Sequence, residues 1–154
     1  MIRIATLGRF VVFRDGVEWP AIPAQPLRAA LLLYLAIERE ATRERALALL
    51  WPERSEARAR HALSQSLSDL RRLLEGPGIL AQGELLRATE ELEVDALDFQ
   101  RAVDGGEYAR ALELYAGVFL DGWHLVDSPE FETWMDRQRT RLAHAFRNTA
   151  RTLA

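Results

Sequence analysis

Hydrophobic and polar positions alternate with helical periodicity between Ser55 and Leu74, a segment that follows a strong stop signal at Pro52. At about 100° per residue, the apolar positions of this segment fall on one stripe. The stripe consists of Leu63, Leu67, Leu70 and Leu74, widened by Ala59, Ala62 and Ser66. The opposite face carries polar and cationic residues three and four positions apart, namely Arg58, His61, Gln65, Ser68 and Arg72. The pattern predicts an amphipathic helix with a buried stripe and a polar, cationic outer face.

A small antiparallel sheet is predicted at the N-terminus. Residues 2–7 and 9–14 alternate as strands, and residues 17–19 form the returning strand. Between them, Asp15-Gly16 favours a hairpin turn, because Gly accepts a positive φ without steric cost.

Two further helices are predicted before the Ser55–Leu74 helix. The first runs from Pro26 to Arg39 and is apolar almost all round, which is typical of a central core helix. Thr42 is placed to cap the second, a short helix over Arg43–Leu50. This succession is helix-turn-helix order, with the third helix placed to read DNA.

After the third helix, the residue pattern is that of short strands. Ile79–Gln82 and Glu84–Arg87 read as two strands around a tight turn at Gly83, with Leu92–Val94 as a third strand. A hairpin directly after a reading helix has the layout of a wing. A plain hairpin that closes the domain explains the pattern equally well, so both interpretations stay open.

From Asp95 onward the pattern is helical. Asp95 is placed to cap a helix to Asp104, and a second helix covers Tyr108–Ala116, so the pair resembles the αα-hairpins of helical repeats. Ser128 and Pro129 then open a long helix that continues to the end of the sequence. Its apolar face is covered by the preceding helices, by a second copy of the protein, or by sequence beyond this chain.

These elements predict an α+β winged helix-turn-helix over residues 1–94, followed by an all-α helical domain over residues 95–154 that is incomplete. With 154 residues, of which 49% are hydrophobic, the chain can bury a real core. It contains no Cys, which excludes disulfides and thiolate zinc sites and fits a cytoplasmic location. The most apolar run, Leu27–Ile37, is too short to cross a bilayer, so we expect no membrane association.

The charge is divided unevenly along the chain. Residues 1–74 hold 12 Arg and 8 acidic residues, a net charge of +4, whereas residues 75–154 hold 8 Arg and 15 acidic residues, a net charge of −7. A charge of +4 gives only modest attraction to DNA, because each neutralised phosphate releases about one counterion. Specific contacts or dimerisation must supply the rest of the affinity.

Enzyme chemistry finds no support in the sequence. A chain without Lys cannot form a phosphate-binding loop of the Walker type, and His61, His124 and His144 are far apart. The acidic residues near the start of the last helix, including Glu130 and Glu132, fit a favourable helix N-terminus. We therefore expect no catalytic residue, no metal and no cofactor.

The outer face of the Ser55–Leu74 helix has the side chains that read DNA. Arg binds guanine and Gln binds adenine in the major groove with two hydrogen bonds each, and the N-terminal half of such a helix usually lies deepest. The expected base contacts are Arg58, His61 and Gln65. The expected contacts to the DNA backbone are Arg54, Ser68, Arg72, Arg28 and Arg87.

Several motifs in order carry a family resemblance. They are Leu7-Gly8-Arg9-Phe10, Arg28-Ala29-Ala30-Leu31-Leu32, Leu49-Leu50-Trp51-Pro52, Leu70-Arg71-Arg72-Leu73-Leu74, Ala111-Leu112-Glu113-Leu114-Tyr115, Gly117-Val118-Phe119-Leu120-Asp121-Gly122 and Pro129-Glu130-Phe131-Glu132-Thr133-Trp134. The first half resembles the OmpR-type winged helix of SARP-type bacterial transcriptional activators, and the second half resembles their bacterial transcriptional activation domain with TPR-like helices. The resemblance covers essentially the whole chain.

The resemblance implies an activator that binds double-stranded promoter DNA as a head-to-tail homodimer on direct repeats and contacts RNA polymerase. The chain departs from the family in a wing, residues 82–86, without a glycine-rich loop or an aromatic residue, and in a shorter activation domain. It therefore looks like a truncated version or a short variant. The alternative function is a protein-interaction adaptor whose winged helix has lost DNA affinity and whose acidic helical half binds a partner.

Overall fold

The predicted N-terminal hairpin is present in the computed structural model, which describes residues 1–154. Strands β1 (Ile2–Ala5) and β2 (Val11–Arg14) pair antiparallel, and β3 (Val17–Glu18) returns along β2. The turn uses Asp15-Gly16, both at positive φ, as expected. A fourth strand, β7 (Leu92–Val94), pairs with β1 in parallel, so the sheet order is β3-β2-β1-β7. The strand expected beside the wing thus belongs to the N-terminal sheet.

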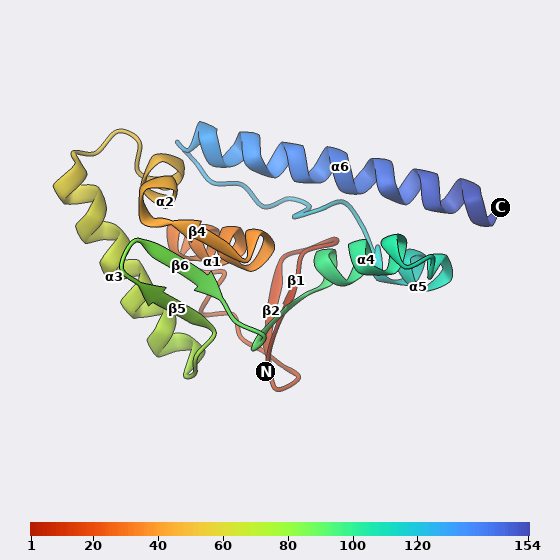
Figure 1. The fold of residues 1–154 in the computed structure, drawn as a ribbon, viewed down its shortest axis with the longest axis horizontal. Coiled ribbons are helices and arrows are strands. Elements are labelled where there is room, and N and C mark those ends of the chain that lie inside the picture. The colour runs from red at the N-terminus through yellow and green to blue at the C-terminus, as the bar shows by residue number, and fades with distance from the viewer.

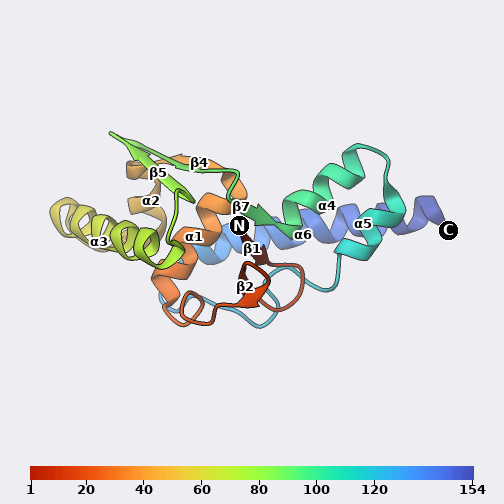
Figure 2. The ribbon, with the colours of Figure 1, turned by 90° about the horizontal axis from the view of Figure 1, so that it is seen from below.

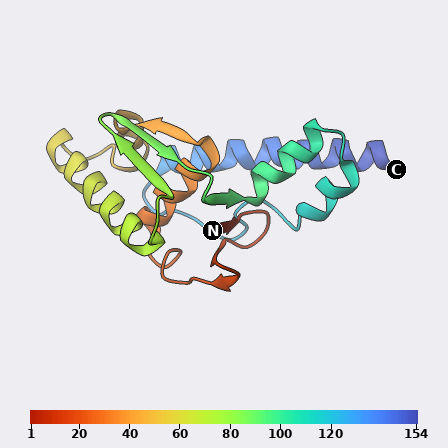
Figure 3. The same cartoon turned by 60° about the horizontal axis from the view of Figure 1, so that its bottom comes forward.

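The helices of the N-terminal half follow the predicted order. Helix α1 (Pro26–Glu38) is buried without interruption from Ala29 to Ile37, and α2 (Arg43–Leu50) is capped by Thr42, whose Oγ1 accepts a hydrogen bond from the Arg45 amide at 3.1 Å. Helix α3 (Glu56–Leu74) packs against both. Figure 3 shows α3 at one end of the molecule, beside the β5–β6 hairpin.

The hairpin after α3 consists of β5 (Ile79–Gln82) and β6 (Leu85–Ala88). It is joined by β4 (Glu40–Thr42), a strand that the sequence pattern did not predict, to give a three-stranded sheet of order β4-β6-β5. The hairpin is therefore anchored by the chain that links α1 to α2, as in a winged helix.

Three helices make up the second half. Helix α4 (Asp95–Asp104) starts directly after β7, and α5 (Tyr108–Leu114) packs beside it as a helical pair. Helix α6 (Pro129–Leu153) runs along most of the long axis of the molecule, and α3 lies at the opposite end from α4 and α5 (Figures 1 and 2). Ser128 precedes α6, but its side chain forms no capping hydrogen bond.

The apolar face of α6 is covered mainly by preceding helices. It packs on α2, α4 and α5, which bury its larger apolar residues, and only Leu153 near the end is 49% exposed. The residues buried on this face are Phe131, Trp134, Met135 and Leu142. Of the three coverings considered from sequence, the preceding helices account for most of the face. No helix is long and apolar enough to cross a membrane.

One hydrophobic cluster joins the two halves of the chain. Trp134 of α6 packs edge-on against Tyr34 of α1, with ring centroids 5.2 Å apart, and its Nε1 donates a hydrogen bond to Glu38 Oε1 at 2.9 Å. The loop before α6 lies against the chain that follows β1, where the Gly8 amide donates to the Val118 carbonyl at 3.0 Å. The orientation of α3 relative to α6 is thus set by packing and hydrogen bonds.

Candidate nucleic-acid interface

Helix α3 has the amphipathic character that its sequence predicts. The stripe leucines are between 0% and 3% exposed. Ser55 is the N-cap, and its Oγ accepts a hydrogen bond from the Arg58 amide at 3.4 Å. The helix ends at Glu75, which adopts a left-handed conformation with φ of 51°. This capping and packing leave one face of α3 in solvent along its whole length.

The predicted outer face of α3 is exposed. Its members, Arg58, His61, Gln65, Ser68 and Arg72, are all solvent-accessible. Arg58, and Arg54 in the preceding turn, have no ion-pair partner within the protein. Two cations and two hydrogen-bonding side chains of the N-terminal half are therefore free to contact a ligand.

Two hollows flank the N-terminal half of α3. One lies between α3 and the start of α1, and its lining includes Arg28, Arg54, His61 and Gln65. The other surrounds the first turn of α3 and again includes Arg54 and His61, with Arg58. The structure thus brings together all three expected base contacts and two of the five expected backbone contacts, from three separate segments of the chain.

Two expected backbone contacts are tied to one carboxylate. Arg72 donates a hydrogen bond from its guanidinium to Asp69 Oδ1 at 3.0 Å, and Arg28 lies 3.9 Å from Asp69 Oδ2. Arg28 also donates to the Ala21 carbonyl at 3.2 Å, and its side chain is only 16% exposed. Arg28 therefore points inward, whereas the Arg72 side chain remains 71% exposed.

Charged residues of the β5–β6 hairpin also form ion pairs within the protein. Arg87 on β6 lies 3.5 Å from Glu40 on β4, and it lies outside both hollows. Glu84 at the hairpin turn pairs with Arg60 of α3 at 3.1 Å, and the Arg43 side chain donates to the Gly83 carbonyl at 2.7 Å. These contacts draw the hairpin turn back toward α2 and α3 rather than outward.

Sequence reasoning missed Arg43 and Arg60 as members of this surface. Arg60 donates hydrogen bonds to the carboxylates of Glu84 and Glu56, and these bonds, the one to Glu84 first, raise the pKa of its guanidinium. The spacing of Glu56 and Arg60, four residues apart, is a signal that the sequence contains. The contacts of both arginines to the hairpin turn depend on tertiary packing and have no local signal.

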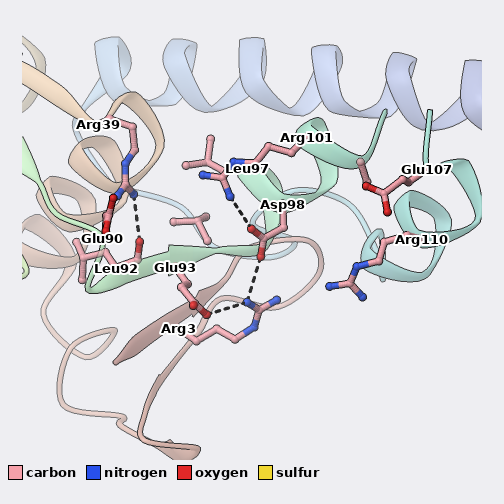
Figure 4. A pocket seen from close by; sticks show the side chains of 12 residues that line it. Arg3, Arg39, Glu90, Leu92, Glu93, Leu97, Asp98, Arg101, Glu107 and Arg110 are labelled. Atoms are coloured by element: carbon pink, nitrogen blue, oxygen red, sulfur yellow. Dashed lines mark hydrogen bonds and ion pairs between the residues drawn. The ribbon is translucent and has the colours of Figure 1, made fainter. Parts of the chain in front are cut away.

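A further hollow lies at the junction of the two halves (Figure 4). Its lining holds four arginines and four carboxylates, namely Arg3, Arg39, Arg101, Arg110, Glu90, Glu93, Asp98 and Glu107. Asp98 pairs with both Arg3 and Arg101, at 3.2 and 2.9 Å. The charges balance, so this hollow offers no excess charge to an ionic ligand.

Arg39 occupies the inner end of the junction hollow. Its guanidinium donates to the carbonyls of Ala36, Thr89 and Leu92 at 2.7 to 3.2 Å. Burial, and next the charge of Arg101, lower the pKa of Arg39. Since its donors satisfy backbone carbonyls, Arg39 fastens α1 to the β6–β7 connection and has a structural role.

Comparisons with known proteins add a fold-level finding. No protein-family model matches this chain, and no curated protein sequence matches it. Among solved structures, the chain is similar to Mycobacterium tuberculosis EmbR in complex with a low affinity phosphopeptide, with a TM-score of 0.67 and 22% sequence identity. The match covers 94% of this chain and 43% of the EmbR chain, so this chain spans less than half the length of that protein.

This likeness shows that the chain shares the fold of the matched part of EmbR. It confirms the resemblance at the level of architecture, a small mixed α and β unit followed by helices. The contacts of α3 with DNA rest on the geometry of the exposed face and remain a proposal.

Proposed function

We propose that this protein is a sequence-specific DNA-binding transcriptional regulator, an activator that binds promoter direct repeats as a homodimer and contacts RNA polymerase. The observation that carries the proposal is the exposed N-terminal half of α3. There, Arg58, His61 and Gln65 lie together and Arg54 is unpaired, beside hollows that the protein itself leaves open. The SARP-type fold supports the same conclusion.

The proposed contacts divide by role. Arg58, His61 and Gln65 contact base edges in the major groove, since Arg and Gln match guanine and adenine there. Arg54, Ser68, Arg72 and Arg87 contact the DNA backbone, whereas Arg28, which the sequence also placed there, is turned inward onto Asp69 and the Ala21 carbonyl. Among the backbone contacts, Arg54 is the strongest candidate, because no carboxylate neutralises it.

The two halves of the chain have different proposed roles. Residues 1–94 form the DNA-binding domain, and residues 95–154 form the acidic helical activation domain, whose helices α4 and α5 lie at the opposite end of the molecule from α3 (Figure 1). This arrangement keeps acidic side chains away from the negatively charged DNA and favours one orientation of the protein on the duplex. EmbR was solved with a phosphopeptide, so a protein partner of the regulator is part of the proposal.

The first test is fluorescence anisotropy with a promoter fragment from the gene's own neighbourhood, a scrambled duplex, and two salt concentrations. We expect the promoter preference to persist at the higher salt, because base contacts are less sensitive to salt than phosphate contacts. Equal binding to both duplexes that vanishes with salt would contradict sequence-specific recognition.

A charge reversal tests the interface itself. Arg58→Glu combined with Arg72→Glu should abolish promoter binding, since each change places a carboxylate against phosphates or base acceptors. The matched control is Arg137→Glu combined with Arg147→Glu, because both residues are exposed on α6 and have no ion-pair partner. Equal loss of binding in both double variants would show that the interface does not lie on α3.

The second candidate is the adaptor function, in which the winged helix has no DNA affinity and the acidic half binds a protein. The pairing of Arg28, Arg60, Arg72 and Arg87 with carboxylates favours it, because paired cations attract phosphates weakly. An adaptor would show no promoter preference. The Arg58→Glu, Arg72→Glu variant of an adaptor would also still bind the protein partner. Co-purification from the source cell measures this binding.

A further inference from the structure

The carboxylate of Asp69 lies at the edge of the proposed DNA-binding face. Asp69 is one helical turn beyond Gln65 on α3, and it lines the same hollow as His61, Gln65 and Arg28. Its side chain is 22% exposed. A carboxylate in this position repels phosphates unless cations neutralise it, and two arginines do so here.

The two arginines are held differently. Arg72 uses one guanidinium nitrogen for Asp69 and keeps 71% of its side chain exposed, so its other donors still face solvent. Arg28 is turned inward between Asp69 and the Ala21 carbonyl, and its Nε has no acceptor in the protein. Arg28 keeps this inward position although one buried donor is unsatisfied, and Asp69 is the carboxylate with which it forms an ion pair.

The three side chains together carry a net charge of +1, whereas two unpaired arginines would carry +2. From this arrangement we infer that Asp69 restrains DNA binding: it holds Arg28 away from the duplex and removes one positive charge from the interface. This inference rests on the proposed function. It assigns Asp69 the role of setting the affinity and salt dependence of the interface, through Arg28.

Removing the charge of Asp69 without changing the shape of its side chain tests whether Asp69 restrains DNA binding. Asp69→Asn should raise the affinity for the promoter fragment and for the scrambled duplex, and should steepen the dependence of log K on log salt by about 0.9, the effect of one additional counterion. The gain in affinity at 50 mM salt should therefore exceed the gain at 200 mM by roughly threefold. The matched control, Asp104→Asn, changes an exposed carboxylate at the end of α4 and should alter neither quantity.

A double variant tests the route through Arg28. Arg28→Gln alone should change DNA affinity little, because Arg28 is restrained in the native protein. In the Asp69→Asn background, the same change should remove most of the gain. A thermal melt of each variant establishes that the comparison is made on folded protein.

The outcomes separate the inference from the proposed function. A lower affinity of Asp69→Asn would show that Asp69 instead orients its arginines for phosphate, and would overturn the restraint. Equal losses from Arg28→Gln in both backgrounds, or an unchanged salt dependence, would overturn it as well, as would absence of measurable binding by Asp69→Asn. A gain that is equal on both duplexes, with no promoter preference in any variant, would sustain the restraint and contradict sequence-specific regulation.

Discussion

The carboxylate of Asp95 links the two halves of the chain at the scale of a single residue. It is buried and accepts hydrogen bonds from the Thr6 amide at 2.8 Å, the Thr6 hydroxyl at 2.6 Å and the Leu7 amide at 2.9 Å. It also accepts from the Ala96 amide at 2.8 Å, at the start of α4. One side chain thus satisfies donors at the end of β1 and at a helix N-terminus.

Replacing Asp95 should be strongly destabilising. Asp95→Ala leaves several buried donors without acceptors, each of which costs about 1–3 kcal/mol, so we expect the free energy of unfolding to fall by about 2–4 kcal/mol. Urea denaturation followed by circular dichroism measures the change. Asp104→Ala, an exposed change on the same helix, should remain within about 0.5 kcal/mol of the native protein. Similar values for both variants would contradict the role of Asp95.

Local sequence predicted Asp95 as the cap of α4, but the N-cap is Val94 and Asp95 is the first helical residue, and no local pattern indicated its bonds to the chain after β1. The capping signal depends on residues within one turn, whereas Thr6 is 89 positions away. The same limit applies to the interface. The arginines of the outer face were predicted by helical spacing, but the contact of Arg28 with Asp69 and that of Arg60 with Glu84 arise only when separate elements pack.

At the scale of elements, α3 was the most predictable part of the chain because its apolar stripe repeats over about four turns and its cap is a Ser. The stripe also accounts for its stability, since Leu63 and Leu70 are fully buried. The helix presents its outer face only while this stripe stays packed on α1 and α2.

A core substitution in the stripe should destabilise the fold without touching the outer face. Leu70→Ala removes a fully buried side chain, and such changes cost about 2–5 kcal/mol, depending on how far the cavity collapses. Ser64→Ala, an exposed position of the same helix, should change stability by less than about 0.5 kcal/mol. Thermal and chemical unfolding of the two variants compare them directly, and a mild effect of Leu70→Ala would mean that the stripe is loosely packed.

Strands β4 and β7 show what sequence analysis misses in short elements: β4 was not predicted at all, and β7 was predicted as a strand but its pairing partner was not. Each has only three residues, too few to display a periodicity. Arg39, which directly precedes β4, has a φ of 72°, an unusual conformation for a non-glycine residue that no local propensity favours. The pattern did indicate Leu92–Val94 as a strand, but its parallel pairing with β1 depends on the path of the entire N-terminal half.

At the scale of the whole molecule, the two halves differ in proposed role but share one core. Leu7, Phe10 and Tyr34 from the N-terminal half belong to the same hydrophobic cluster as Phe119 and Trp134 from the helical half. Burial of such side chains contributes about 1.5–3 kcal/mol each, so either half alone would expose a large apolar surface.

A fragment of residues 1–94 should therefore be much less stable than the full chain. We expect a lower denaturation midpoint and a tendency to associate, because the surface that α4 and α6 cover becomes exposed. Urea unfolding and light scattering measure the two properties. Removal of residues 151–154 alone, all of which are exposed, should leave both unchanged. A fragment that is monomeric and as stable as the full chain would show that the N-terminal half folds independently.

The hydrogen bond between Trp134 and Glu38 has a consequence for the direction in which the protein points along a promoter. It helps to fix α6 to α1, the helix that supports α3. Under the proposed function, the base sequence that α3 reads would therefore also determine the direction in which α6 points. On direct repeats, successive copies head the same way and lie on one side of the duplex when the spacing equals whole helical turns of about 10.5 base pairs. Adding about 5 base pairs between repeats would place the α6 helices on opposite sides, leaving each copy bound but separating the surfaces that a polymerase would meet together.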